Sequence, residues 1–329
     1  MRHLNAEMLS RILGQTVDVE IEPLNTGHIS DVARVHIRPN AIHSKLVPGT
    51  LIYKAAPSGV SSSIENAFTS QARERSFYLE IAPNLSIPTP KLWYASPVTD
   101  PKKWLLIEDV QPIEGLSLTE DQALNRLGEI HRHTVGRPIT KILFANNISA
   151  LYQQINLIPT EKINRLLEHS ASVSPKLAAH MMHALQQKLV PETTANKALI
   201  HCDYRWDNLS PARDGTVFDW GDYCFGPISF DLSYFVMTSM GHLHPKDNLG
   251  WQRLFDAYSG KQQAETEQAE TASLTLGIES EALKLEVKQL AALVAWTPTL
   301  LLLSDLALSP TQTLYWQKTL QTCSTWFAS

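Results

Sequence analysis

The sequence predicts an α+β protein of two lobes, in which a small N-terminal sheet lobe with one main helix precedes a larger, mostly helical lobe. Residues 17–56 alternate apolar and polar positions as strands do, whereas the pattern after about Leu118 follows the helical period. With 329 residues and 43% hydrophobic content, the chain can bury a sizeable core divided over two lobes. We place the domains at 1–110 and 111–329.

The first lobe is interpreted as a small sheet with one inserted helix. A polar turn at residues 24–30 separates the first two strands, and a run of serines before the helix can cap its exposed N–H groups. The expected strands are 17–24, 31–37, 50–56, 91–96 and 104–110, and the expected helix spans about 63–81.

In the second lobe the helical pattern is interrupted once. Residues 201–223 are its only strand-like region, and Asp214-Gly215 within them is a hairpin turn signal. The Gln- and Glu-rich segment 261–273 fits either a solvated helix or a loop. The expected helices are 119–134, 147–157, 160–171, 174–190, 229–241, 249–274, 280–303 and 310–327.

Composition excludes some classes of partner and location. The net charge is −5 and the Lys and Arg residues are scattered, which argues against nucleic acid as a partner. The three cysteines are odd in number and lack paired spacing, which favours a reducing, cytoplasmic location over a disulfide framework. The N-terminal residues show no signal-peptide pattern.

The longest apolar segment runs from Leu290 to Leu308 and approaches membrane-spanning length. Thr297-Pro298 interrupts it and Asp305 lies inside it, so a buried helix pair is expected rather than a membrane span. The oligomeric state stays open.

Three polar residues of the interrupting stretch form a candidate site. Asp203 and Asn208 are five residues apart, and Asp219 follows across the predicted hairpin. Mg²⁺ takes a few protein oxygens and completes its shell with water and phosphates, so Asn208 and Asp219 suit it. Asp203 would then orient or deprotonate a hydroxyl that attacks phosphorus. The ordinary alternative is a group of turn-forming residues on a surface hairpin.

The spacing of His201, Asp203 and Asn208, followed by Asp219-Trp220-Gly221, is a kinase catalytic signature. Its details resemble the aminoglycoside phosphotransferase-like family of small-molecule kinases, in which Trp commonly follows the metal-binding Asp. The resemblance covers roughly residues 20–240, and Tyr204-Arg205 is similar to the steroid-kinase-like branch.

This resemblance implies a bilobal protein-kinase-like fold with an antiparallel N-terminal sheet. It also implies ATP- and Mg²⁺-dependent phosphorylation of a hydroxyl group on a small molecule, with Asp203 as catalytic base and Asn208 and Asp219 as metal ligands. His201 would be structural, and Asp231, at a helix start, would brace the catalytic loop.

The sequence departs from the family pattern at two loop positions. Cys202 stands where the family usually has Gly, and Arg205 where many members have His. Neither change removes an essential oxygen. Cys202 and Cys224 are interpreted as small apolar fillers, because two cysteines without a second pair make a poor metal site.

The nucleotide-binding residues are expected in the first lobe. Lys54 ends a strand, and Glu74 shares the buried face of the expected helix, where a carboxylate needs a cation. The resemblance makes Lys54 the phosphate-positioning lysine and Glu74 its partner. It places the turn with Gly27 over the phosphates, and the backbone of Glu108 and Val110 at the adenine edge.

Two other functions stay as alternatives. A pseudokinase-type nucleotide-binding regulatory module would predict a broken Asp, Asn or Lys position, and a metal-dependent hydrolase would want further metal ligands near His201. The acceptor stays open among aminoglycoside, choline, sugar-derivative and steroid-like compounds, as do ATP versus GTP and the role of Asp222. The aromatic residues near the motif that suit a partly apolar or amine-bearing acceptor are Tyr204, Trp206, Tyr223, Phe225 and Tyr234.

Overall fold

The computed structural model divides into two compact units. Unit 1 comprises Met1–Ser117 and Ser210–Gly221, and unit 2 comprises Leu118–Leu209 and Asp222–Ser329. The structure describes residues 4–24, 31–39, 47–56, 65–100, 103–110, 117–135, 159–169, 173–186, 197–239, 241–243, 245–260, 280–303 and 308–328. Gly27 with its turn, the expected helix 147–157 and the segment 261–273 lie outside these ranges.

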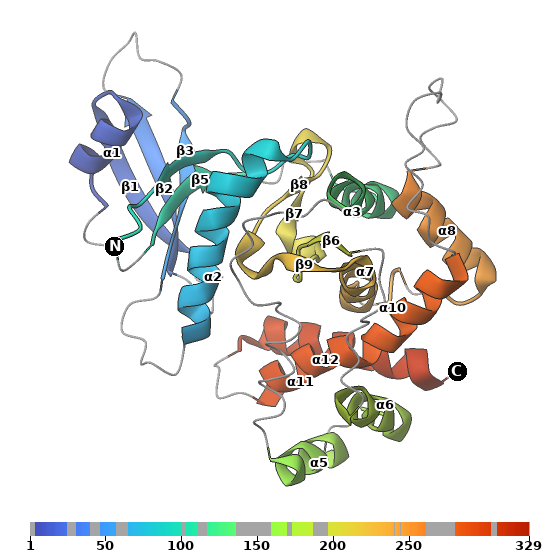
Figure 1. Cartoon of the computed structure of the whole chain (residues 1–329). Coiled ribbons are helices and arrows are strands. Elements are labelled where there is room, and N and C mark those ends of the chain that lie inside the picture. The colour runs from blue at the N-terminus through green and yellow to red at the C-terminus, as the bar shows by residue number, and fades with distance from the viewer. Residues whose placement is uncertain are drawn as a thin grey trace, which may run out of the picture. The chain divides into compact units, whose positions relative to one another are not determined.

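Unit 1 is built on a five-stranded antiparallel sheet with the strand order β1-β2-β3-β5-β4 (Figure 1). The strands are β1 (Val17–Leu24), β2 (Asp31–Pro39), β3 (Thr50–Ala55), β4 (Leu92–Ala95) and β5 (Leu105–Glu108). All five overlap the strand ranges expected from the sequence. Alternate residues of β2 (Ala33, Val35 and Ile37) and of β3 point into one core, because side chains on a strand alternate between its faces.

Two α-helices lie within the described residues of unit 1. Helix α1 (Ala6–Leu13) is capped by the Asn5 side chain and by Gly14 at a φ of 71°, and its Leu9 packs into the sheet core. Helix α2 (Glu65–Ser76) continues as a π-helical turn, η2 (Phe77–Ile81), and then as a short 3₁₀ turn, η3 (Ala82–Asn84). The predicted helix 63–81 is therefore α-helical only over its first part.

The segment Ser210–Gly221 packs with unit 1, although the sequence analysis assigned it to the second lobe. The backbone N–H of Val217 donates to the carbonyl of Pro88, and Trp220 stacks on Phe77. In the motif region β7 (Leu209–Ser210) and β8 (Thr216–Val217) form a two-stranded sheet around the expected turn at Asp214-Gly215. The 3₁₀ turns η4 (Trp206–Asn208), η5 (Ala212–Asp214) and η6 (Trp220–Asp222) complete the motif region.

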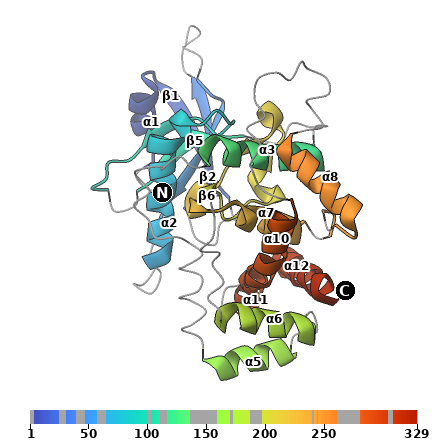
Figure 2. The same cartoon turned by 45° about the vertical axis from the view of Figure 1, so that its right-hand side comes forward.

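Unit 2 is mostly helical and surrounds helix α7 (Ile228–Thr238), in which every residue is buried. Helix α3 begins with a capping box between Thr119 and Gln122. Contacts join α7 to α3, α10 and α12, and α12 to α6 and α11 (Figure 2). The other helices are α3 (Glu120–Thr134), α5 (Thr160–His169), α6 (Pro175–Gln186), α8 (Asn248–Ser259), α10 (Ser280–Val294), α11 (Trp296–Leu303) and α12 (Pro310–Ala328).

Unit 2 also contains two strands that the sequence analysis missed. Strands β6 (Lys197–Ile200) and β9 (Cys224–Pro227) pair antiparallel on either side of the motif. The interrupting stretch is therefore not the only strand region of the second half. Each of these strands has four residues, too few for a period to be recognised.

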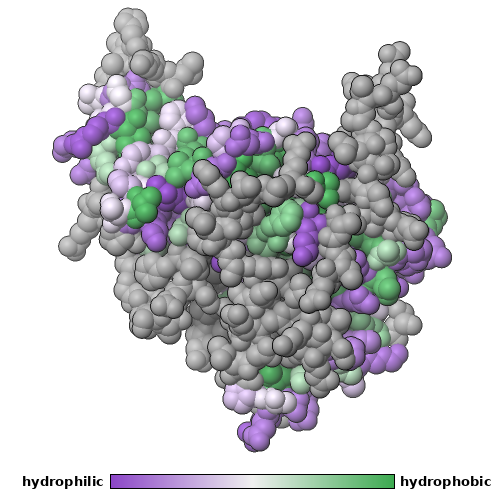
Figure 3. Space-filling view, in the orientation of Figure 1, coloured by the Kyte–Doolittle hydropathy of each residue, from purple (hydrophilic) through white to green (hydrophobic). Residues whose placement is uncertain are grey.

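The apolar C-terminal segment contains two consecutive helices, but the break falls at Ala295, between α10 and α11. The expected interruption, Thr297-Pro298, lies instead in the first turn of α11, where proline is tolerated. Within the described residues, Glu281–Leu302 is the one stretch long and apolar enough to cross a membrane by composition, and 56% of its most apolar window is buried inside the protein. Hydrophilic and apolar residues are interspersed on the visible face of the described residues (Figure 3).

Candidate functional site

Lys54 is held between two carboxylates in unit 1. Its Nζ donates to Oε1 of Glu74 at 2.7 Å and to Oδ1 of Asp219 at 2.6 Å. Lys54 is 8% exposed and Glu74 is 2% exposed, whereas the Asp219 side chain is 46% exposed. The predicted pairing of Lys54 with Glu74 is thus present in the structure.

Burial and charge act in opposite directions on Lys54. Burial lowers its pKa, but the adjacent charges of Asp219 and Glu74 and their hydrogen bonds outweigh burial, so the pKa is raised above its ordinary value of 10.5. The ammonium group therefore stays charged at neutral pH. With two carboxylates around one ammonium, the cluster carries a net charge of about −1.

The surrounding elements fix both partners of Lys54. Strand β3 pairs Lys54 with Leu105 of β5, and the Gln71 side chain of α2 donates to the Lys54 carbonyl. Glu74 lies three residues before Phe77, which packs face to face on Trp220 at 4.1 Å between ring centroids. The last turn of α2 therefore supplies Glu74. The π-helical turn that follows it supplies Phe77, on which the segment that carries Asp219 packs.

Trp220 explains why a tryptophan follows Asp219. It is fully buried, and its indole N–H donates to the carbonyl of Val217 at 3.0 Å. Asp219 itself has a φ of 64°, in the left-handed region that non-glycine residues seldom adopt. Stacking of the next residue helps to hold Asp219 in this conformation, with its carboxylate on Lys54.

The loop that carries Asp203 in unit 2 is braced by Asp231, as the sequence analysis expected. The backbone N–H groups of His201 and Cys202 donate to the two carboxylate oxygens of Asp231 at 2.6 and 2.8 Å. Asp231 is completely buried in the first turn of α7, where the positive end of the helix dipole favours a carboxylate. Cys202 takes a φ of 67°, which accounts for the usual preference for Gly at this position.

A buried histidine extends this brace to two further helices. His131 of α3 lies with Nδ1 2.6 Å from the Tyr258 hydroxyl of α8 and with Nε2 3.4 Å from Asp231. Burial, together with the charge of Asp231, raises the pKa of the Tyr258 phenol, so the hydroxyl remains protonated. His131 and Tyr258 were not found from sequence, because their spacing in the chain carries no motif.

The Asp203 carboxylate is contacted from three directions. Asn208 donates through Nδ2 to the Asp203 carbonyl at 2.8 Å and to Oδ2 at 2.9 Å. Arg205 places Nε 3.3 Å from Oδ1. The Tyr234 hydroxyl of α7 also hydrogen-bonds Asp203, and burial and this carboxylate raise the pKa of the phenol well above its ordinary value. Two of the predicted site residues, Asp203 and Asn208, are therefore joined directly.

Arg205 was recorded in the sequence only as a departure from the family, but it lies at the centre of the unit 2 site. Its Nη1 is 3.2 Å from Asp207, and its guanidinium lies 5.8 and 5.5 Å from the ring centroids of Tyr315 and Trp316 on α12. Burial lowers its pKa, but Asp203 and the other neighbouring groups raise it more, so the guanidinium stays charged.

The expected adenine-edge residues lie at the end of β5. Glu108 donates its backbone N–H to the Lys91 carbonyl, and its carboxylate accepts from Arg213 at 2.7 Å. Val110 follows the strand and is partly exposed. Gly27, the expected phosphate-covering residue, lies outside the described residues. The roles of Glu108 and Val110 in binding nucleotide stay predictions.

The three cysteines are buried free thiols, and Cys202 and Cys224 lie with their sulfur atoms 3.4 Å apart. Burial raises the pKa of Cys202 well above its ordinary value, so the thiol is neutral. No group of three or more metal-binding side chains of the His, Cys, Asp or Glu type occurs among the residues that the structure describes.

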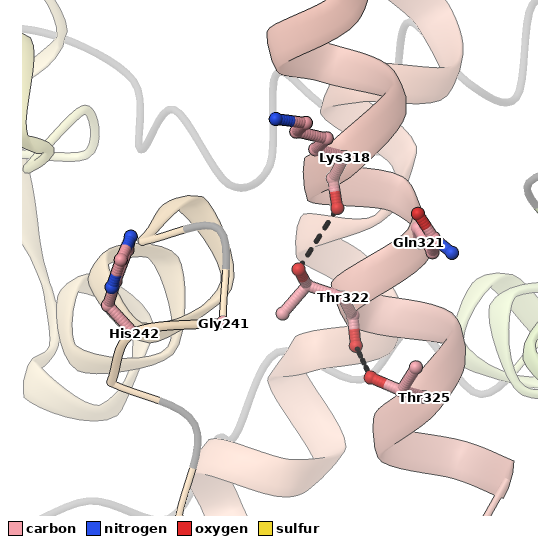
Figure 4. Close-up of a pocket in the computed structure, with 6 residues that line it drawn as sticks. All are labelled: Gly241, His242, Lys318, Gln321, Thr322 and Thr325. Carbon is pink, nitrogen blue, oxygen red and sulfur yellow. Dashed lines mark hydrogen bonds between the residues drawn. The ribbon is translucent and has the colours of Figure 1, made fainter.

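A groove of about 420 Å³ opens between α12 and the turn that follows α7 (Figure 4). Its lining residues are Gly241, His242, Lys318, Gln321, Thr322 and Thr325. Thr322 and Thr325 donate their hydroxyl protons to the carbonyls of Lys318 and Thr322, within their own helix. None of the predicted site residues lines this groove.

Comparison with solved structures shows the same fold in small-molecule kinases. The chain is similar to APH(2″)-IIIa in complex with GDP and kanamycin (12% identity, TM-score 0.56, 98% of this chain and 99% of that chain). It is also similar to the amicoumacin kinase hAmiN in complex with AMP-PNP, Ca²⁺ and Ami (12%, 0.55, 98% and 94%). A thermostable mutant of aminoglycoside phosphotransferase APH(4)-Ia also matches (11%, 0.51, 98% and 98%).

No curated protein matches the sequence significantly. The family profile described as APH, phosphotransferase enzyme family, matches residues 45–259, well over half of the chain. The match includes Lys54, Glu74, the whole 201–223 motif and Asp231. The protein therefore belongs to the phosphotransferase enzyme family and has the fold of the aminoglycoside phosphotransferases.

Proposed function

We propose that the protein transfers the γ-phosphoryl group of ATP to a hydroxyl group of a small molecule, with Mg²⁺ and with Asp203 as catalytic base. The observation that carries the proposal is the buried Lys54 cation between Glu74 and Asp219. A buried cation with two carboxylates is costly as a purely structural device. It becomes useful if Lys54 positions phosphates while Asp219 faces a metal.

Each site residue would have its own role in the reaction. Asp203 would orient the acceptor hydroxyl and accept its proton as the new oxygen–phosphorus bond forms. The bond between the γ-phosphorus and its bridging oxygen breaks, and ADP leaves. Glu74 would keep Lys54 in place on the phosphates. Alignment and charge neutralisation, rather than a covalent enzyme intermediate, would supply most of the rate gain.

Asn208 and Asp219 suit a divalent metal by their donor chemistry. Each offers an oxygen, and Mg²⁺ prefers oxygen ligands from few protein groups together with phosphates. The amide nitrogen of Asn208 is bonded to Asp203, so its amide oxygen is the atom that would serve as ligand. A bound Mg²⁺ would neutralise charge that develops on the phosphates.

The nucleotide would be bound by unit 1, through Lys54, the loop with Gly27 and the backbone of Glu108 and Val110. Either ATP or GTP is compatible with backbone recognition of the base. The related structures were solved with GDP in one case and with AMP-PNP in another. We infer ATP as the donor and a cytoplasmic location, the latter because buried free thiols suit a reducing compartment.

The acceptor is proposed as a small hydroxyl compound of the aminoglycoside, choline or steroid type. APH(2″)-IIIa was solved with kanamycin and hAmiN with Ami, so compounds of these kinds belong in a first screen. The screen would measure ADP and GDP release from the Mg²⁺ complexes of ATP and GTP, followed by identification of the phosphorylated product.

The test compares wild type with Asp203→Asn on every active acceptor. Asp214→Asn is the matched control, because it makes the same chemical change in a turn where Asn tolerates positive φ. We expect Asp203→Asn to lose turnover about 10²- to 10⁴-fold and the control to retain it. Turnover that survives Asp203→Asn undiminished would refute the assignment. Nucleotide binding without turnover on any acceptor would favour a regulatory module instead.

A further inference from the structure

The side chain of Arg205 connects the catalytic loop to the C-terminal helix. Its guanidinium lies near carboxylates on one side, Asp203 at 3.3 Å and Asp207 at 3.2 Å. The rings of Tyr315 and Trp316 on α12 lie 5.8 and 5.5 Å from the guanidinium carbon. All of these residues belong to unit 2.

The two aromatic residues can restrict where the guanidinium lies. An arginine side chain has many rotamers, and ordering it costs free energy unless its surroundings select one. A guanidinium is attracted to aromatic faces within about 6 Å, and Arg suits such sites better than Lys because it is planar. Trp316 is 7% exposed, so it is itself held by packing.

Helix α12 is in turn fixed against α7. The Tyr315 hydroxyl donates to the carbonyl of Thr238 at the end of α7 at 3.2 Å. The same helix α7 supplies Asp231, which holds the backbone of the loop, and Tyr234, which hydrogen-bonds Asp203. The aromatic pair is therefore tied to the helix that already holds the catalytic loop.

Asn208 and Arg205 contact different oxygens of the Asp203 carboxylate. Asn208 donates to Oδ2 at 2.9 Å, whereas Arg205 approaches Oδ1. A hydrogen bond to Oδ2 and a positive charge beside Oδ1 together favour one rotation of the carboxylate about its Cβ–Cγ bond. Small errors in the position of a catalytic group are costly in rate, because reacting atoms must be aligned within a fraction of an ångström.

We propose that Arg205 is a positioning residue for the Asp203 carboxylate, and that α12 keeps Arg205 in place through Tyr315 and Trp316. The proposal rests on the proposed function, since it assigns Asp203 to the reaction. It gives the C-terminal helix a part in catalysis through contact with the loop, without contact with the reacting atoms.

The first experiment measures hydrolysis of MgATP by the full chain, with water as acceptor, so that no identified acceptor is needed. Arg205→Ala should lower kcat about 10- to 100-fold and change the KM for MgATP less than about 2-fold. Guanidinium ion at about 20 mM, far below denaturing concentrations, should restore part of the loss. Urea at the same concentration has a similar shape without the charge and should restore nothing.

Arg38→Ala is the control for the loss of an arginine, because Arg38 is an exposed residue of β2 paired with Glu20. Its kcat should equal that of wild type. A parallel loss of thermal stability and kcat in Arg205→Ala, without rescue by guanidinium, would reduce Arg205 to a structural residue and overturn the proposal.

The second experiment tests the path through α12. Trp316→Leu should lower kcat about 5-fold in wild type and have no further effect in the Arg205→Ala background, because both changes act on the same contact. Trp326→Leu, which alters another buried tryptophan of α12, is the matched control. It should reduce thermal stability to a similar extent and leave kcat unchanged.

The outcomes separate this proposal from the proposed function. If the loss of kcat in the Trp316→Leu/Arg205→Ala variant equals the product of the two single losses, α12 acts independently of Arg205. That result would overturn the proposal and leave the proposed function intact. MgATP hydrolysis that is no faster in wild type than in Asp203→Asn would count against the proposed function and remove the positioning role with it. A double-mutant cycle of unfolding free energies for Arg205 and Trp316 would still report whether the two side chains are in contact.

Discussion

The two units hold their predicted site residues by different physical means. In unit 1 the carboxylates of Glu74 and Asp219 are held by a full charge, the Lys54 ammonium. In unit 2 the loop is held mainly by hydrogen bonds, from backbone N–H groups to Asp231 and from Asn208 to Asp203. The unit 1 site therefore depends on keeping charges balanced, whereas the unit 2 site depends on keeping a loop conformation.

The largest effect should follow from removing the cation of unit 1. Lys54→Met removes the ammonium group beside Glu74, which is 2% exposed, and should cost about 3–5 kcal/mol of unfolding free energy. Lys54→Met/Glu74→Gln removes the buried charge and should recover most of that loss without recovering phosphoryl transfer. Urea unfolding of both variants measures this.

Lys197→Met is the control for that comparison, since Lys197 is an exposed residue at the start of β6. It should change the unfolding free energy by less than about 0.5 kcal/mol. Equal stability of the single and double variants would mean that charge balance does not govern the unit 1 site.

A smaller effect is expected from weakening the brace in unit 2. Asp231→Asn replaces a carboxylate that accepts from His201 and Cys202 by a group with one acceptor oxygen. The unfolding free energy should fall by about 2–3 kcal/mol, and kcat should fall with it while nucleotide affinity is retained. Thermal unfolding and nucleotide titration check both parts. Retention of full kcat would show that the loop is held without Asp231.

The difference between the units should also appear at alkaline pH. The pKa of Lys54 is raised in the folded protein above its ordinary value of 10.5. Its contribution to stability is therefore complete below that value and is lost as pH rises toward the folded pKa. Between pH values of about 9 and 11, the unfolding free energy of wild type should fall by about 1 kcal/mol more than that of Lys54→Met/Glu74→Gln. Parallel pH profiles from urea unfolding would contradict this.

The smallest effect is expected at Cys202. Cys202→Gly relieves a side chain at a φ of 67° but loses its buried contact with Cys224 and gains entropy in the unfolded chain. These terms oppose each other, so the unfolding free energy should change by less than about 1 kcal/mol. A larger change in thermal unfolding would show that the sulfur pair contributes more than packing.

Local patterns predicted the parts of the molecule that local physics determines. The strand alternation located β1, β2 and β3, and the helical period placed Glu74 on the same buried face as Phe77, so its need for a cation could be inferred. The bracing role of Asp231 came from the family resemblance and agrees with its two backbone hydrogen bonds.

Contacts between distant segments could not be predicted in this way. The position of Arg205 against Tyr315 and Trp316 depends on how α12 packs on α7, and no spacing in the sequence encodes that packing. Strands β6 and β9 are too short to show a period. The segment 210–221 packs with unit 1 through the stacking of Trp220 on Phe77, two residues that are far apart in the sequence.

The central claim is that Asp203 acts on the acceptor hydroxyl while unit 1 binds the nucleotide. The most direct measurement is kcat for phosphoryl transfer by Asp203→Asn, alongside its Kd for MgATP. We predict a kcat about 10²- to 10⁴-fold below that of wild type with an unchanged Kd. A kcat equal to that of wild type would contradict the account.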